Sequence, residues 1–154
     1  NDPLLGGGNN DSIEGGAGND SIDGGTGDDT VTGGGGDDVF VFGAGYGGDV
    51  ITDFNTGNSG ALDDGDQTNN DFLDLSPYYE TIFDVREDLN DDGILNQSNG
   101  VATGSTALGG SITLTGVSAS DLTFDNINVA CFTAGTLIDT DEGPIAVEHL
   151  TSDI

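Results

Sequence analysis

Residues 6–41 read GGGNNDSIE, GGAGNDSID, GGTGDDTVT and GGGGDDVFV when they are written in blocks of nine. Each block follows one pattern: glycine, glycine, any residue, glycine, any residue, aspartate, any residue, an apolar residue, any residue. The single departure is Asn9, which stands where glycine is expected. After Val41 the register slips, and Gly47-Gly48-Asp49-Val50-Ile51 resumes it. A fixed short period of this kind predicts a solenoid.

Each block predicts a turn followed by a short strand. The three residues around the apolar one, such as Ser12-Ile13-Glu14, suit a strand whose middle side chain faces inward. The six residues before them suit a turn, because glycine permits positive φ and close backbone packing. Two blocks then form one coil, with Ile13 and Ile22 facing each other across a thin interior. We therefore expect a mainly β fold, a parallel β-roll (β-solenoid) whose coils stack in parallel.

Stacking brings together aspartates that are two blocks apart, since coils lie about 4.8 Å from one another. The pairs are Asp2–Asp20, Asp11–Asp29 and Asp20–Asp38. Each pair of bare carboxylates would repel by about 3 kcal/mol at an effective dielectric near 20. Ca²⁺ takes about six to eight oxygen ligands and accepts both carboxylates and backbone carbonyls, whereas Mg²⁺ demands octahedral geometry and keeps its waters. We therefore expect several Ca²⁺ ions to be required for folding.

The composition supports a cation-dependent fold and excludes several partners. Among 154 residues there are 28 glycines and 29 acidic residues against one basic residue, Arg86, for a formal net charge of −28. Such acidity indicates disorder unless a cation neutralises the carboxylates. Nucleic acid is not an expected partner, because phosphate recognition needs basic residues. No apolar run approaches transmembrane length, and the single cysteine excludes an internal disulfide.

The blocks resemble the RTX (hemolysin-type) nonapeptide repeats of proteins exported by type I secretion, which form calcium-loaded β-rolls. The resemblance covers residues 1–54 and implies a secreted, extracellular protein that engages the type I secretion machinery. It implies carboxylate ligands at Asp2, Asp11, Asp20, Asp29, Asp38 and Asp49. It implies carbonyl ligands at Gly15, Ala17, Gly24, Thr26, Gly33 and Gly35. Residues 1–5 fit the end of an earlier block, so we expect the array to begin upstream in a longer protein.

Residues 55–128 are expected to be a small mixed β/α cap over the roll. The apolar side chains of residues 39–54 are denser than in the repeats and suit the start of such a cap. Strands are expected within residues 71–75, 111–117 and 122–128. Ser76-Pro77 suits the N-cap and first position of one short helix, with Tyr79, Ile82, Phe83 and Leu89 following at roughly helical spacing.

The end of that helix carries a candidate second calcium site. Asp88, Asn90, Asp92 and Gly93 match positions of an EF-hand-type loop, although Asn99 stands where the loop has its bidentate glutamate. The alternative is a helix-terminating turn made of residues that favour the left-handed conformation. The sequence leaves both interpretations open.

Residues 129–154 are expected to begin a further domain. Strands within residues 136–140 and 145–150, joined by a turn, predict a hairpin. The run VACFTAGTLIDTDEGPIAVEHL resembles the opening of the β-rich Hint fold of hedgehog C-terminal domains and inteins. That resemblance implies that Cys131 attacks the carbonyl of Ala130 in an autoprocessing step. The family's Thr-x-x-His motif does not follow, and His149 is expected on a strand surface, so we expect no catalysis by this chain itself.

Two other functions stay open. The chain is alternatively the C-terminal portion of a secreted hydrolase or protease whose active domain lies upstream, since it contains neither His-Glu-x-x-His nor Gly-x-Ser-x-Gly. It is alternatively part of an adhesin or ice-binding array, although the outward row Ser12, Ser21, Thr30 and Val39 is only partly regular. The leading prediction is an extracellular calcium-binding β-roll module attached to the start of a Hint domain.

Overall fold

The computed structural model describes residues 1–60, 69–97, 109–129, 137–138 and 145–146. The N-terminal third forms stacked strands, as predicted: β1 (Pro3–Gly8), β2 (Ser12–Ala17), β3 (Ser21–Thr26), β4 (Thr30–Gly35), β5 (Val39–Val41) and β6 (Gly48–Ile51). Three shorter strands follow: β7 (Phe72–Asp74), β8 (Ser111–Leu114) and β9 (Ile127–Asn128).

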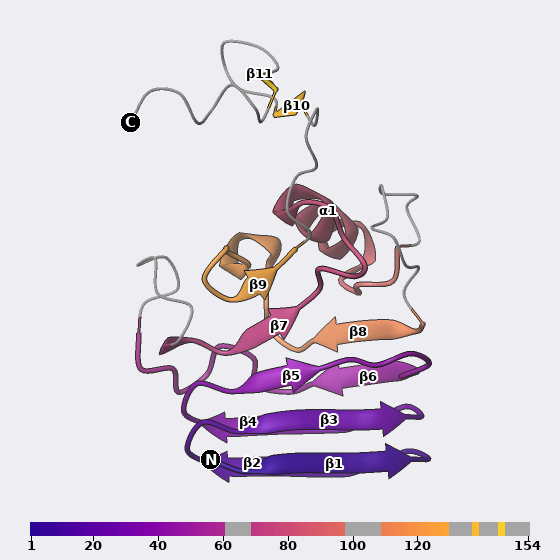
Figure 1. Cartoon of the computed structure of the whole chain (residues 1–154), viewed down its shortest axis with the longest axis vertical. Helices are drawn as coiled ribbons and strands as arrows, with labels where there is room; N and C mark the ends of the chain where they lie inside the picture. The colour runs from indigo at the N-terminus through magenta and orange to yellow at the C-terminus, as the bar shows by residue number, and fades with distance from the viewer. Residues whose placement is uncertain (61–68, 98–108, 130–136, 139–144, 147–154) are drawn as a thin grey trace.

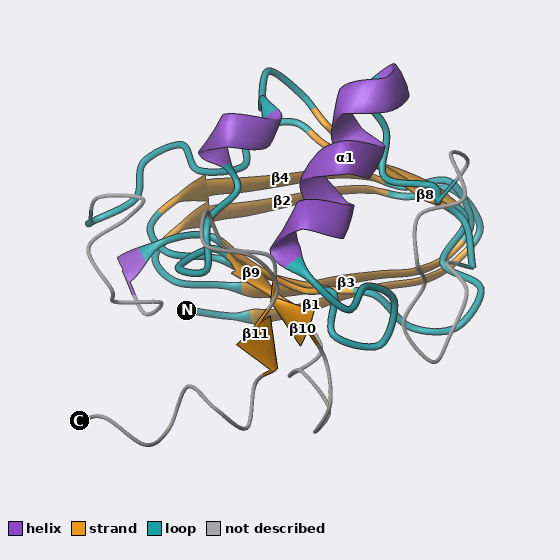
Figure 2. Ribbon diagram, turned by 90° about the horizontal axis from the view of Figure 1, so that it is seen from above, coloured by secondary structure: helices purple, strands orange, loops and turns teal. Residues whose placement is uncertain are grey.

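Consecutive strands alternate between two parallel sheets. One sheet has five strands in the order β1-β3-β5-β7-β9, and the other has four in the order β2-β4-β6-β8. Figure 1 shows the strands stacked in layers, and Figure 2 shows the two sheets running side by side with turns at both ends. This arrangement confirms the parallel β-roll and the prediction that two blocks make one coil.

The inward apolar residues form one column in each sheet. In the first sheet the pairing Leu4↔Ile22, Ile22↔Phe40, Phe40↔Leu73 and Leu73↔Ile127 continues through every strand. In the second, the column is Ile13, Val31, Ile51 and Leu114. Burial increases along both columns, from the partly buried Leu4 and Ile13 to residues that are fully enclosed. The sheets therefore continue beyond residue 54.

The strands are longer than the sequence predicted. The first four each contain six residues, because the two glycines and the residue after them extend the strand instead of forming the turn. The turn itself is reduced to the fourth, fifth and sixth positions of each block. Its fourth residue has positive φ, as in Gly18 (111°) and Gly27 (130°), and Asn9 adopts the same region at 78°. Asparagine tolerates this conformation better than most residues, which explains why the block accepts it.

The prediction that residues 39–54 start the cap is wrong. Phe40 and Ile51 belong to β5 and β6, and Tyr46 and Phe54 complete the core of the same coil. Their large side chains fill the interior of this coil, where the Phe40 and Phe54 ring centroids are 6.0 Å apart.

The predicted helix exists but begins later. Helix α1 spans Ile82–Asp92, and Thr81 and Asp84 form a reciprocal capping box at its start. The prediction that the helix starts at Ser76-Pro77 is therefore wrong. The chain forms a turn at this point, in which the Tyr79 N–H donates to the Leu75 carbonyl. The helix begins only after the capping box. Phe83 lies on the solvent side of the helix and is 67% exposed.

Helix α1 and a 3₁₀ turn (Ala119–Asp121) cover the end of the roll (Figure 2). The guanidinium of Arg86 donates from Nε to the Leu122 carbonyl at 2.8 Å and joins the helix to the chain after this turn. Ile82, Val85 and Leu89 form the buried face of the helix. The expected mixed β/α arrangement is thus present over the last coils.

The two strands of the predicted C-terminal hairpin are present. β10 (Leu137–Ile138) and β11 (Ile145–Ala146) pair in antiparallel fashion. Cys131, Ala130 and His149 lie outside the described residues. Within the described ranges no helix is long and apolar enough to cross a membrane.

Replacing Gly34 by alanine tests the close stacking of the coils. Gly34 has a φ of +107°, and a Cβ there would lie 2.0 Å from the carbonyl oxygen of Gly16 in the coil below. Gly16→Ala is the matched control, since its φ is +101° but a Cβ would meet no atom within 4 Å. Urea unfolding in excess Ca²⁺ is expected to show a loss of about 1–2 kcal/mol for the control and about 2–4 kcal/mol for Gly34→Ala. Equal losses would contradict this packing.

Candidate metal centre

The repeat aspartates form a hydrogen-bonded ladder along each side of the roll. On one side, the N–H of Asp2 donates to Asp20 Oδ1 at 2.7 Å, and the N–H of Asp20 donates to Asp38 Oδ1 at 2.8 Å. On the other, the N–H of Asp11 donates to Asp29 Oδ1 at 2.8 Å, and that of Asp29 donates to Asp49 Oδ1 at 3.0 Å. The predicted pairing of aspartates two blocks apart is therefore confirmed.

The second oxygen of these carboxylates is buried without a partner. Asp20, Asp29 and Asp38 are only 2%, 1% and 0% exposed. Their Oδ2 atoms, and that of Asp11, have no hydrogen-bond partner within the described structure. Since an ionised carboxylate oxygen is costly to bury unpaired, these positions fit a bound cation. Asp2 is the exception among the predicted carboxylates, because it is exposed.

Each unpartnered oxygen faces the first glycine of its own block. A Cβ on Gly33 would lie 2.4 Å from Asp38 Oδ2, and one on Gly24 would lie 2.4 Å from Asp29 Oδ2. A Cβ on Gly15 would lie 2.9 Å from Asp20 Oδ2. Glycine is therefore required at this position to leave room beside the carboxylate.

Backbone carbonyls complete the oxygen-rich surroundings. The Gly24 and Gly33 carbonyl oxygens lie 2.3 and 2.4 Å from where a Cβ on Gly6 and Gly15 would stand, so they face the neighbouring coil. The Gly35 carbonyl accepts the N–H of Gly18 at 2.7 Å. Among the described residues, no three acidic, histidine or cysteine side chains are grouped to hold a metal by themselves. An ion here must draw part of its ligands from the backbone, as calcium does. The individual carbonyl ligands, including Ala17 and Thr26, stay predictions.

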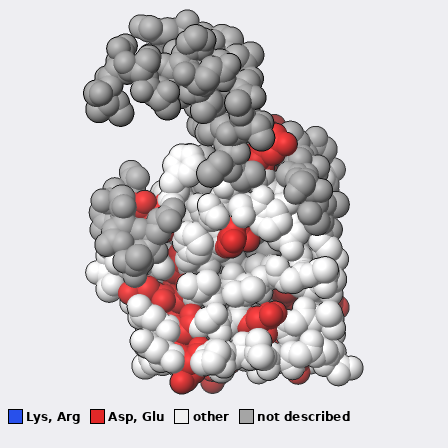
Figure 3. Space-filling view, in the orientation of Figure 1, with Lys and Arg blue, Asp and Glu red and all other residues white. Residues whose placement is uncertain are grey.

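Burial disfavours the ionised form of three of these carboxylates, Asp38, Asp49 and Asp71. Burial raises the pKa of Asp49 to about 6 and that of Asp71 to about 7, and it also raises the pKa of Asp38. The neighbouring carboxylates add to each shift. The single basic side chain, Arg86, donates to Leu122 instead. Figure 3 shows acidic side chains in a column along the left-hand edge of the roll and no basic side chain on this face.

A second ladder lies at the fifth position of the blocks, which the sequence pattern had left unassigned. The N–H of Asn19 donates to Asn1 Oδ1 at 2.7 Å, and the N–H of Asp37 donates to Asn19 Oδ1 at 3.2 Å. On the opposite edge, the N–H of Asp28 donates to Asn10 Oδ1 at 3.0 Å. Only asparagine or aspartate occupies this position in the four blocks. This restriction was the feature of the sequence that could have predicted the second ladder.

Two further acidic residues join the ladder from outside the repeats, and the sequence analysis missed both. Asp71 Oδ1 accepts the N–H of Asp38 at 2.9 Å. Asp53 accepts the N–H groups of Gly33 and Gly34 at 2.9 and 2.8 Å. The signal for Asp71 was its place two residues before the apolar Leu73, as in a block, but 33 residues separate it from Asp38.

The first residues of the predicted EF-hand-type loop are helical, and Asn99 lies outside the described residues. Asp88, Asn90 and Asp92 lie within α1, and Gly93 ends the helix with a φ of 82°, so the helix-terminating alternative describes this segment. Asp88 is 0% exposed. Its Oδ2 accepts the Tyr79 hydroxyl at 2.5 Å and the N–H groups of Asn96 and Gln97 at 2.7 and 2.8 Å. The side chain therefore holds the chain after the helix against its last turn.

Comparison with known families agrees with the geometry of the roll. Residues 5–40 and 15–48 match the model of the RTX calcium-binding nonapeptide repeat, which spans four copies. The matched segment is thus a calcium-binding RTX repeat array, and the residues that form the buried ladder lie in and beside it. No curated protein and no solved structure matches the chain significantly.

Calcium affinity is expected to rise with pH. The folded-state pKa values of Asp49 and Asp71, about 6 and 7, exceed the ordinary value of an aspartate. Their contribution to the stability of the metal-free fold is therefore fully present below about pH 4 and is lost as pH rises through 6 and 7. Because Ca²⁺ must displace these protons, calorimetric titration should show affinity increasing up to about tenfold per pH unit for each proton released. A flat profile from about pH 5 to pH 7 would contradict the assignment.

Asp88→Asn is expected to destabilise the cap without removing a calcium ion. The change should cost about 1–3 kcal/mol, because one buried oxygen serves three donors. Native mass spectrometry in saturating Ca²⁺ should give the wild-type count of bound ions. Loss of one ion from the folded variant would restore the EF-hand interpretation.

Proposed function

We propose that residues 1–54 are a β-roll module that folds when it binds several Ca²⁺ ions, in a protein that acts outside the cell. The observation that carries this proposal is the set of buried carboxylate oxygens without hydrogen-bond partners, each facing a glycine of the same turn. Hydrogen bonds satisfy Oδ1 of Asp20, Asp29 and Asp38 and leave Oδ2 of the same carboxylates for a cation.

The proposed ligands are the carboxylates of Asp11, Asp20, Asp29, Asp38 and Asp49, with Asp2 at the exposed end. The carbonyls predicted from the repeat pattern complete each site. Bound Ca²⁺ would supply positive charge between coils, and the chain's own residues orient the oxygens. Ladder N–H groups hold Oδ1 of Asp20, Asp29 and Asp38, and glycines leave space beside Oδ2 of the same three carboxylates.

Folding that depends on calcium suits secretion. Without the cation, the net charge of −28 and the buried carboxylates oppose compaction. An unfolded chain can pass through a secretion channel and fold where Ca²⁺ is abundant. The proposal of type I secretion rests on the resemblance to RTX proteins and on the matched repeat array.

We also retain the interpretation of residues 129–154 as the start of a Hint domain, with Cys131 as its nucleophile. Its support is the sequence similarity alone, since the β10–β11 pair agrees with any hairpin. Function as the C-terminal portion of a secreted hydrolase, protease or adhesin is compatible with the roll and concerns residues outside this chain.

Far-UV circular dichroism of the chain in Ca²⁺, in Mg²⁺ and in chelator tests the proposal. The β signal is expected in Ca²⁺ and absent in the other two, because only Ca²⁺ suits these mixed oxygen ligands. A β signal that persists in chelator would show that the roll folds without the metal.

The variant Asp29→Asn sharpens this test, because its amide oxygen retains the acceptor for Asp11 while an NH₂ group replaces the unpartnered oxygen. The calcium concentration needed for half-maximal folding should rise about tenfold or more. Glu14→Gln, which removes a charge at an exposed position of the roll, should leave that concentration within about twofold. Equal increases in the half-maximal calcium concentration of both variants would show that the effect comes from net charge alone and not from a lost ligand.

A further inference from the structure

The two sheets of the roll present different outer faces to solvent. Alternate residues of a strand point to opposite sides of a sheet, so the residues before and after each inward apolar residue face outward. In the sheet β2-β4-β6-β8 the outward side chains carry mostly hydroxyl groups. The register of its strands gives two outward rows, Ser12-Thr30-Val50-Thr113 and Glu14-Thr32-Thr52-Thr115. This face is therefore polar and suited to contact with water.

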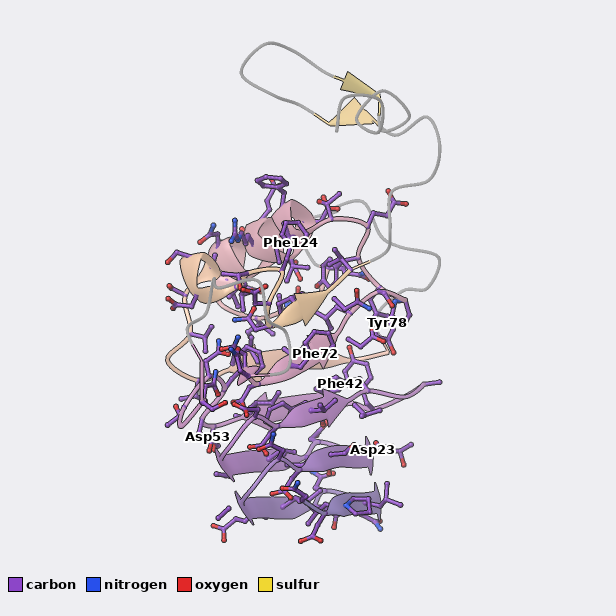
Figure 4. The ribbon with its side chains drawn as sticks, turned by 60° about the vertical axis from the view of Figure 1, so that its left-hand side comes forward. Asp23, Phe42, Asp53, Phe72, Tyr78 and Phe124 are labelled. Atoms are coloured by element: carbon purple, nitrogen blue, oxygen red, sulfur yellow. The ribbon has the colours of Figure 1, made fainter. Side chains whose placement is uncertain are left out.

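The outer face of the sheet that contains β1, β3, β5 and β7 is more apolar. Its two outward rows are Pro3-Ser21-Val39-Phe72 and Leu5-Asp23-Val41-Asp74. Leu5, Val39 and Val41 are 78%, 38% and 42% exposed, and they are three of the five large apolar side chains that are exposed among the described residues. Figure 4 shows Phe72 nearer the cap than Asp23. Exposed apolar side chains gathered on one face mark a contact surface.

A groove of about 600 Å³ follows the first of these apolar rows. Its floor consists of the first residues of four successive strands of the sheet, Pro3, Ser21, Val39 and Phe72. The polar residues that precede these strands, such as Asn19 and Asp37, line its other side and form its rim. Because neighbouring strands lie about 4.8 Å apart, the groove is about 14 Å long.

The width of the groove suits an extended chain. Its floor is a single row of side chains, and the next outward row lies about 6.6 Å away along the strands. An α-helix with its side chains is about 10–12 Å across, so it would rest on both rows and on the rim without entering the groove. An extended segment is narrow enough to lie along the floor.

The rim of the groove is held by hydrogen bonds among its own residues. Asn19 Nδ2 donates to Asp37 Oδ2 at 3.2 Å, and Asn19 Oδ1 accepts the N–H of Asp37 at 3.2 Å. The carboxylate of Asp37 also accepts the N–H and the hydroxyl of Ser59, both at 2.8 Å. These bonds preorganise the rim. Because they engage its polar groups, recognition must depend mainly on the apolar floor and on charge.

Carboxylates flank the groove on both sides. Asp37 lies in the rim, and Asp23 and Asp74 lie in the next outward row. None of the three belongs to the buried ladder, so ions bound there would leave these charges in place. Arg86, the single basic residue of the chain, donates to the Leu122 carbonyl in the cap. Basic side chains of an occupant would therefore be complementary to this surface, whereas a second copy of the chain, with its net charge of −28, would be repelled.

We propose that this groove binds an extended segment of a partner protein in which apolar and basic side chains alternate. Every second side chain of an extended segment points the same way, so the apolar ones enter the groove and contact Val39 and Phe72. The long stems of the basic side chains bring their charges to Asp37 on one side and to Asp23 or Asp74 on the other. The roll is thus a binding surface as well as a module that folds with calcium.

Chemical-shift mapping of the isotope-labelled wild-type chain in saturating Ca²⁺ tests the proposal. The probe is a synthetic peptide of about eight alternating valine and lysine residues, which exceeds the groove in length at about 3.3 Å per residue. Saturable shifts are expected at the amides of Ser21, Val39 and Phe72. The amides of Thr30, Val50 and Thr113, on the other sheet, should not shift. The absence of saturable shifts, or shifts confined to the other sheet, would overturn the proposal.

Two further peptides separate the apolar contribution from the charge. A valine–glutamate peptide and a serine–lysine peptide of the same length should each bind about tenfold more weakly than the valine–lysine peptide, or less well still. Equal affinity of the serine–lysine peptide would show that charge alone attracts the probe. Equal affinity of the valine–glutamate peptide would show that the acidic flanks select nothing. Either result would overturn the proposal.

Val39→Ser and Val50→Ser are matched variants, because the two valines occupy the same strand position on opposite sheets. Val39→Ser should raise the dissociation constant of the valine–lysine peptide about tenfold. Val50→Ser should leave it within about twofold. Far-UV circular dichroism in Ca²⁺ verifies that each variant folds. Equal effects of the two substitutions would contradict the site, and if Val39→Ser does not fold, the shift map of the wild-type chain decides.

Discussion

The structure depends on the close approach of buried aspartates in successive coils. The spacing of parallel strands brings each carboxylate to the coil below, where its Oδ1 accepts a backbone N–H, as in Asp38 and Asp20. The same spacing leaves the other oxygen enclosed and unpartnered. One geometric constraint therefore produces both the ladder that orders the turns and the negative charge that a cation must balance. Glycine is part of this constraint, because a side chain at Gly33 would collide with the carboxylate.

The apolar core is unevenly distributed along the roll. The first coil contributes the partly buried Leu4 and Ile13, whereas a later coil encloses Tyr46 and the cap encloses Tyr79. The cap thus supplies hydrophobic stabilisation that the glycine-rich coils lack. The first coils must draw proportionally more of their stability from bound ions, since burying one apolar side chain per block contributes only about 1.5–3 kcal/mol.

The sequence was sufficient to predict the regular part of the roll. The period of nine places one apolar residue and one aspartate per block, and a two-block coil follows from strand alternation, so the pairs Asp11–Asp29 and Asp20–Asp38 could be derived before the structure. The strand lengths could not, because glycine is compatible with both turn and strand, and only stacking against the next coil extends β2 and β4.

The irregular part depended on tertiary contacts that no local pattern encodes. Asp71 resembles a repeat aspartate only when β7 is placed on β5, and the inserted turn hides that relation. The spacing at Asp88 matched a calcium loop because helix ends and calcium loops share aspartate, asparagine and glycine. The buried hydroxyl of Tyr79 and the N–H groups that follow the helix determine its actual role.

Hydrogen exchange of the ladder amides tests the dependence of this fold on calcium most directly. The N–H groups of Asp20, Asp29 and Asp38 donate to the carboxylates of the next coil. In saturating Ca²⁺ they should exchange slowly, and after chelation they should exchange at the rate of an unfolded chain. Retained protection of these amides in chelator would contradict the account, because the ladder would then form without a cation.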